Sequence, residues 1–184
     1  MSKISSLIIT RRKFNRLGLV AAGLSLAIAI NSCGTSKSSA GQYEAIAKAT
    51  YTWRVRYSNA PTDDKRGHYE DFESTSLTTV NGQKPEGGVM KDNNKDVWWP
   101  KLPPKPSVDQ IESGKKSPSE KIGKLELGQT IEYRVKFDKS GEMLNLPTNY
   151  SVYRQVSQVD SDTPMDFTMG VNNGSVTKAT PVIN

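Results

Sequence analysis

The most constraining feature of the sequence is a stretch of alternating apolar and polar side chains over Lys124–Asp138. Large apolar residues take nearly every second position, and charged residues fill most of the positions between them. A period of two places the two kinds of side chain on opposite faces of a β-strand, so the pattern predicts a long, half-buried strand. The apolar positions are Leu125, Leu127, Ile131, Tyr133, Val135 and Phe137, interrupted only by Gln129.

Other segments extend this β pattern. Tyr51–Tyr57 alternates aromatic or β-branched residues with Thr and Arg, which predicts a second half-buried strand. Asp138–Gly141 is interpreted as a type I turn, after which Met143–Leu146 returns as the partner strand. Ser74–Val80 is rich in Ser and Thr and is interpreted as a strand that ends at the turn-forming pair Asn81 and Gly82.

Fewer segments predict helix. Tyr43–Ala49 is rich in alanine and is expected to form a short helix. Ser107 and Gln110 have the spacing of a capping box, which predicts a second helix of one or two turns. Between them, Gln83–Pro106 holds five of the ten prolines and is expected to be extended. Asn149–Val159 is interpreted as a further β-prone run.

These segments predict a mainly β (or α+β) fold, with one small antiparallel β-rich domain and one or two short helices over residues 43–159. Residues 33–42 hold a cysteine followed by a Ser- and Gly-rich stretch, which predicts a flexible tether. Residues 160–184 lose the periodicity and most large apolar side chains, so a loose, disordered C-terminal tail is expected there.

The first 32 residues have a different character. The first sixteen hold five cations and no acid, and Leu17–Ile30 is an apolar run diluted by small residues. A positive segment before a short apolar core is typical of a signal peptide, here residues 1–32. As a helix the run spans about 21 Å, less than the roughly 30 Å hydrocarbon layer of a bilayer, so a permanent transmembrane span is the weaker interpretation.

One motif in this segment resembles an export signal. Thr10–Arg16 is similar to the twin-arginine motif of bacterial signal peptides: Arg11, Arg12 and Phe14 match it, whereas Asn15 stands where Leu is usual. The resemblance implies a domain that folds before it crosses the membrane. The alternative is an ordinary secretory signal with two adjacent arginines.

A second motif resembles a lipidation site. Ile30–Cys33 is similar to the bacterial lipobox, and Cys33 is the only cysteine of the chain. The resemblance implies a lipoprotein that carries diacylglycerol and fatty acyl chains on Cys33, at the extracytoplasmic, periplasmic face of a bacterial membrane. Two or three acyl chains anchor a protein stably where a single chain does not.

The basic charge of the chain belongs to the predicted signal. Its loss removes five of the 25 Lys and Arg and no acid, which leaves 20 against 19 Asp and Glu. A nearly neutral domain gives no support for nucleic acid as a partner. Once Cys33 is acylated no thiol remains, so disulfides, Cys nucleophiles and Cys-ligated metals are excluded by count.

The remaining residues predict no catalytic, cofactor or metal site. His68 is the sole histidine, and the acids that follow it are interpreted as a solvated loop instead of metal ligands or part of a triad. Asp92–Asp96 has the opening spacing of a calcium loop, but Val97 stands where such loops carry Gly. It is interpreted as a polar surface turn.

Trp98–Pro100 is the most distinctive segment of the mature chain. Adjacent indoles beside a proline run could stack on sugar rings or anchor a protein partner. The plainer interpretation is that one Trp packs against the sheet and the other shields a loop. The contact surface that the sequence predicts therefore consists of Trp98, Trp99 and Pro100.

The sequence as a whole predicts a membrane-anchored, non-enzymatic binding or accessory module of the bacterial cell envelope. Its expected partners are the membrane, through the lipid anchor, and an envelope protein or polysaccharide. Two alternatives stay open: an envelope hydrolase that uses carboxylates such as Glu70 and Asp71, and a structural spacer without a specific ligand.

Overall fold

The computed structural model describes residues 36–59 and 67–182, so the predictions for the signal peptide and for Cys33 lie outside the described residues. Of the described residues, 54% are in strands and 13% in helices, which confirms the mainly β class. The strands are β1 (Lys37–Ala40), β2 (Tyr43–Ser58), β3 (His68–Val80), β4 (Met90–Asp92), β5 (Val97–Trp99), β6 (Lys121–Lys139), β7 (Glu142–Thr148), β8 (Met165–Met169) and β9 (Val176–Pro181). The helices are α1 (Val108–Ser113), α2 (Tyr150–Gln158) and the 3₁₀ turn η1 (Val171–Asn173).

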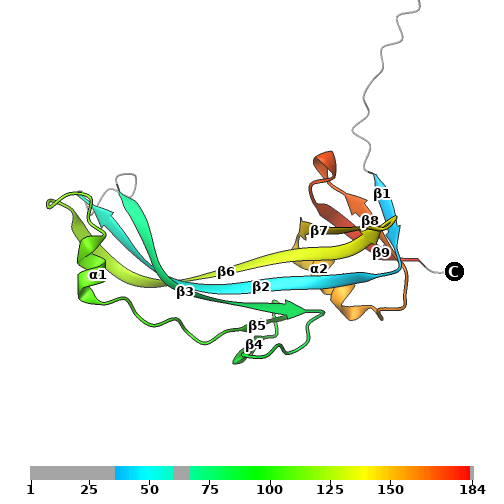
Figure 1. The fold of residues 1–184 in the computed structure, drawn as a ribbon, viewed down its shortest axis with the longest axis horizontal. Helices are drawn as coiled ribbons and strands as arrows, with labels where there is room; N and C mark the ends of the chain where they lie inside the picture. The colour runs from blue at the N-terminus through cyan, green and yellow to red at the C-terminus, as the bar shows by residue number, and fades with distance from the viewer. Residues whose placement is uncertain (1–35, 60–66, 183–184) are drawn as a thin grey trace, which may run out of the picture. The chain divides into compact units, whose positions relative to one another are not determined.

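A seven-stranded sheet in the order β1-β8-β9-β7-β6-β2-β3 forms the centre of the fold. Neighbouring strands pair antiparallel, except for β7 and β9, which meet in parallel at Thr148 and Val176. The strands β4 and β5 form a separate hairpin. The long strands β2, β3 and β6 run between two ends: α1 lies at one, and α2 with β1, β7, β8 and β9 lies at the other (Figure 1).

The predicted strands at Tyr51–Tyr57 and Lys124–Asp138 are confirmed, and they pair with each other as parts of β2 and β6. The short helix predicted over Tyr43–Ala49 is wrong, because these residues are the first half of β2. The alanines of this half continue the period of two and are fully buried. Packing under α2 therefore overrides the helix propensity of alanine.

The β-prone run predicted at Asn149–Val159 is also wrong, because Tyr150–Gln158 forms α2. The Asn149 side chain caps the helix, since its oxygen accepts the backbone N–H of Val152 at 2.9 Å. The buried side chains Val152, Tyr153 and Val156 follow a helical spacing and face the core.

The loose tail predicted for residues 160–184 is corrected by the structure, since β8 and β9 lie within it. Met165, Phe167 and Met169 alternate along β8 and are fully buried. The strand β1 pairs with β8, so residues 37–40 of the predicted tether belong to the sheet. Both ends of the described chain are therefore held in the sheet by pairing with β8.

The predicted cap of α1 is confirmed, whereas the predicted turn after β6 is present but is of another type. Ser107 and Gln110 form the predicted capping box of α1, with backbone N–H donors 3.2 Å and 2.7 Å from the side-chain oxygens. Between β6 and β7, Ser140 and Gly141 have φ of 57° and 90°. Two residues with positive φ match a type I′ hairpin turn, which replaces the predicted type I turn.

Candidate functional site

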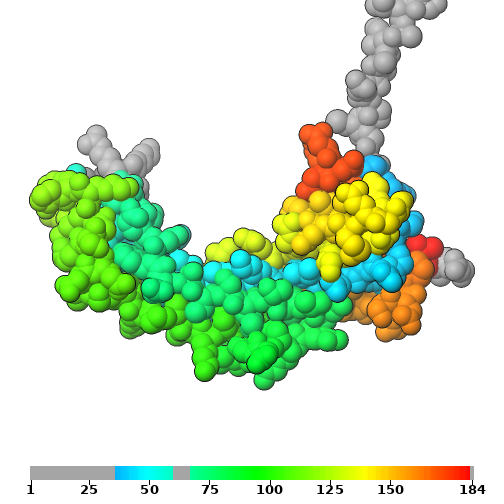
Figure 2. All heavy atoms as spheres, viewed as in Figure 1, coloured from blue at the N-terminus to red at the C-terminus, as the bar shows by residue number. Residues whose placement is uncertain are grey.

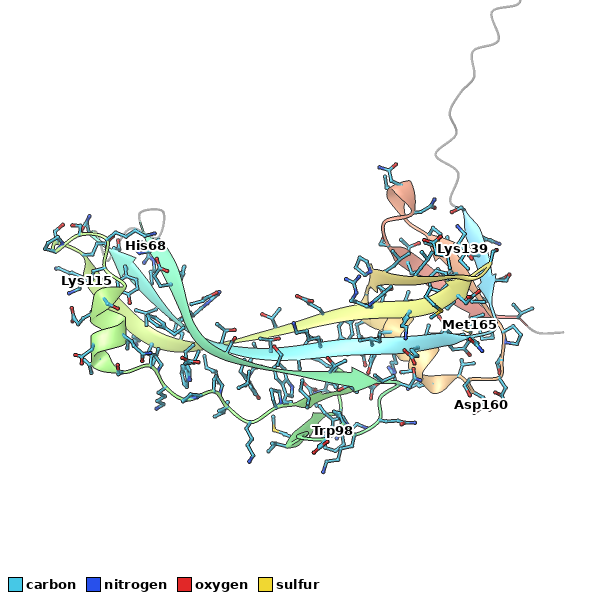
Figure 3. The ribbon with its side chains drawn as sticks, in the orientation of Figure 1. His68, Trp98, Lys115, Lys139, Asp160 and Met165 are labelled. Atoms are coloured by element: carbon cyan, nitrogen blue, oxygen red, sulfur yellow. The ribbon has the colours of Figure 1, made fainter. Side chains whose placement is uncertain are left out.

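Trp98 and Trp99 are neighbours on β5, so their side chains leave the strand on opposite faces. Trp99 is only 2% exposed, and its ring stacks on Tyr51 with 4.5 Å between the centroids. Trp98 is half-buried on the β4–β5 hairpin, and the Lys84 ammonium lies 5.1 Å from its ring centroid (Figure 3). The structure therefore places Trp99 in the core, as the plainer interpretation of this segment expected.

One edge of Trp99 borders a hollow of about 350 Å³, which we call the aromatic pocket. This volume falls within the range of roughly 300–1,000 Å³ that is typical of small-molecule sites. The pocket brings together β5, β6, the start of α2 and the turn before β5. Its lining residues are Lys95, Trp99, Gln129, Ile131, Tyr133 and Tyr150.

Tyr133 lies at the centre of an aromatic cluster. Its ring centroid is 5.6 Å from that of Tyr150 and 4.9 Å from that of Tyr153. Its hydroxyl donates to the backbone carbonyl of Lys95 at 3.2 Å. Burial, followed by the neighbouring Tyr150 and the acids Asp92 and Asp96, raises the pKa of Tyr133 to about 12.

The turn that carries Lys95 is bonded to α2 and is closed by a hydrogen bond of its own. The Tyr153 hydroxyl donates to the Asp96 carbonyl at 2.8 Å, and burial raises the pKa of this phenol as well. Asp92 accepts the backbone N–H of Lys95 at 3.2 Å, which confirms the predicted polar turn. Lys95 and Gln129 are exposed at the pocket, so an ammonium and an amide border an aromatic surface.

A second hollow of about 490 Å³ lies near the start of β2. Its lining includes the ion pair of Lys136 and Glu44, whose nitrogen and oxygen are 3.2 Å apart. These charges already satisfy each other. We therefore regard the aromatic pocket, where the side chains of Lys95 and Gln129 are exposed and have no partner among the described residues, as the candidate binding site.

The carboxylates considered for a hydrolase do not face each other. Glu70 and Asp71 are adjacent on β3, so their side chains point to opposite faces of the sheet. Asp71 accepts from the Arg54 guanidinium at 3.2 Å, whereas Glu70 lies 3.3 Å from the Lys116 ammonium. This pair cannot act together on one glycosidic bond, which needs two carboxyl groups on either side of it.

His68 begins β3 instead of lying in the solvated loop predicted from the sequence. Its two ring nitrogens are 3.4 Å from Glu70 and 3.5 Å from Glu120, and its ring stacks on Tyr57. The two acids thus lie on opposite sides of the imidazole. Across residues 36–59 and 67–182, no group of three or more His, Cys, Asp or Glu side chains is arranged to hold a metal ion.

Sequence reasoning missed the aromatic pocket. Its lining residues come from four separate segments, and among them only Trp99 belongs to the contact surface that the sequence predicts. A second signal was present: Gln129 is the single interruption of the apolar series in β6, and it lines the pocket. A polar residue at a position that otherwise faces the core indicates a place where the core is open.

Comparison with models of protein families, with curated proteins and with solved structures finds no match for this chain. Within the described residues, no helix is both long enough and apolar enough to cross a bilayer.

Proposed function

We propose that this chain is a lipid-anchored binding module of the bacterial cell envelope, which holds a sugar ring of an envelope polysaccharide in the aromatic pocket. The predicted twin-arginine signal exports it, and the acylated Cys33 holds it at the extracytoplasmic face of the membrane. The observation that supports binding is the pocket itself, in which three aromatic side chains meet one ammonium and one amide.

The chemistry of the lining favours a saccharide. The faces of a sugar ring carry C–H groups that pack on aromatic rings, while its edge carries hydroxyls. Tyr133 and Tyr150 provide the aromatic surface, and Lys95 and Gln129 provide donors and an acceptor for hydroxyls. Because Lys95 is held by the turn at Asp92, its backbone needs little ordering when a ligand binds.

Binding is tested by titrating the mature protein with a trimer of N-acetylglucosamine and following tryptophan fluorescence, since Trp99 borders the pocket. Tyr150→Ala should weaken binding about tenfold or more, the equivalent of one lost stacking contact of about 1.4 kcal/mol. Tyr69→Ala is the matched control, because Tyr69 is a 54% exposed tyrosine outside the pocket. Equal affinities for the wild type and Tyr150→Ala would contradict the proposed site.

The anchor is tested by fractionating cells that express the full chain. Cys33→Ser should leave the protein unprocessed or release it from the membrane, whereas Thr35→Ser should behave as the wild type. Replacement of Arg11 and Arg12 by Lys should block export if the twin-arginine route is used. Normal processing and membrane retention of Cys33→Ser would refute the lipoprotein proposal.

A further inference from the structure

The loop between β8 and β9, residues 170–175, carries an unusually exposed apolar side chain. Val171 is 80% exposed, more than any other large hydrophobic residue in the described part of the chain. Asn172 and Asn173 follow it with φ of 52° and 55°, a left-handed conformation that Asn adopts more readily than most residues. A backbone hydrogen bond of 2.8 Å closes the loop, so Val171 is held outward by a defined turn.

This loop contacts the first described residue of the chain. The Ser36 carbonyl accepts the backbone N–H of Met169 at 2.9 Å, and its hydroxyl donates to the Asn173 side chain at 2.5 Å. Figure 2 shows η1, in orange-red, projecting from the surface beside the blue atoms of β1. Val171 therefore lies next to the point where the described chain begins.

The distance from that point to the proposed lipid anchor is short. Cys33 precedes Ser36 by three residues, and three residues of fully extended chain cover at most about 11 Å. The flexible tether expected from the sequence was longer, but its last part is β1. An acylated Cys33 would therefore keep the 170–175 loop close to the headgroups of the bilayer.

Two lysines lie beside the base of the loop. In the strand register Lys37 pairs with Thr168, and Thr168 pairs with Lys178, so both ammonium groups extend from the same face of the sheet. Both lysines are exposed, and neither is in an ion pair with another described residue. The acid on the same face, Asp166, lies farther from the loop and is bonded to the Ser39 hydroxyl.

We propose that the 170–175 loop rests on an anionic lipid surface, with Val171 in the headgroup region and Lys37 and Lys178 against lipid phosphates. This inference rests on the proposed acylation of Cys33. One valine and two lysines bind a bilayer weakly by themselves, but the anchor gives them a high effective concentration at the membrane. The contact orients the domain, with the β1–β8–β9 end at the membrane and the α1 end of the long strands away from it.

The test uses the lipidated protein in vesicles of phosphatidylcholine and phosphatidylglycerol. Cys33 is the only cysteine, so acylated Val171→Cys has one free thiol, which is labelled with an environment-sensitive fluorophore. Asp109→Cys, on exposed α1, is the matched control at the far end. Quenching by lipids that carry a bromine at the headgroup boundary should be several-fold greater for the label at position 171.

A second variant, Lys37→Glu with Lys178→Glu, should lower quenching at position 171 and abolish its dependence on phosphatidylglycerol. Equal quenching of both labels in protein that floats with the vesicles would overturn the loop contact and leave the lipoprotein proposal standing. Labelling of the wild type, or failure to float, shows that Cys33 is not acylated and overturns both proposals. If the label at position 171 responds to the number of protein molecules per vesicle and not to the lipid quenchers, the loop contacts a second copy of the chain. That result would also overturn the proposed contact with lipid.

Discussion

Trp98 and Trp99 show how strongly one position along a strand changes what a residue does. They are chemically identical and adjacent, yet Trp99 stacks on Tyr51 in the core while Trp98 is half-buried on the other face of β5. The backbone N–H of Trp98 donates to the Thr79 hydroxyl at 3.1 Å, which fixes the hairpin against β3. This contact with β3 sets which face of β5 is turned toward the core. Because successive side chains of a strand point to opposite faces, it thereby decides which of the two indoles is buried.

Trp99→Ala should therefore lower the free energy of unfolding by about 3–5 kcal/mol, because it removes a buried aromatic side chain and leaves a cavity. Trp98→Ala is the control, and its cost should be clearly smaller because that side chain is only half-buried. Urea unfolding followed by circular dichroism measures both values. Equal losses for the two variants would contradict the assignment of Trp99 to the core.

At the scale of elements, α2 and α1 have similar caps but different roles. Asn149 caps α2, which buries Val152, Tyr153 and Val156, whereas Ser107 caps α1, which has no buried residue. The start of α2 also carries Tyr150 into the aromatic pocket. The cap of α2 is thus linked to the core and to the candidate site, and the cap of α1 is not linked to the core in this way.

Asn149→Ala should lower the free energy of unfolding by about 1 kcal/mol, the usual cost of a lost N-cap. Ser107→Ala should have a smaller effect on global unfolding, since α1 buries no side chain of its own and contacts the buried Tyr57 at its last turn, through Ile111 and Gly114, away from the cap. Chemical denaturation of the two variants beside the wild type provides the comparison. A larger loss for Ser107→Ala would show that α1 is coupled to the core more strongly than its burial indicates.

At the scale of the whole molecule, the first and last strands of the described chain, β1 and β9, lie on either side of β8 in the sheet. The order β1-β8-β9-β7 places the first strand next to strands from the last part of the sequence. The buried side chains of β8 and β9 complete the core that β2, β6 and α2 begin. The C-terminal segment is therefore a structural part of the domain.

Truncation after Val159 should abolish cooperative unfolding, because it removes Met165, Phe167 and Met169 from the core and leaves β7 without its outer neighbour. Removal of residues 183 and 184 alone, which lie beyond β9, is the control and should leave the unfolding midpoint unchanged. Calorimetry of the two shortened chains distinguishes the outcomes. A cooperative transition after the long truncation would support the loose tail predicted from the sequence.

The elements that could be predicted correctly are those whose signals are local in the sequence. Alternation of side chains defined the cores of β2 and β6, and the spacing of Ser107 and Gln110 defined α1. These predictions succeeded because each signal and the structure it specifies lie within the same few residues. The mainly β class follows from them.

The other elements and the pocket depend on contacts between segments that are distant in the sequence. The alanines of β2 and the aromatic residues of α2 have propensities that contradict their observed state, and burial against distant segments overrides those preferences. The aromatic pocket needs Lys95, Gln129 and Tyr150 in one place, which strand register and helix docking achieve. No local pattern encodes such a meeting, because the residues are adjacent in space and separated in sequence.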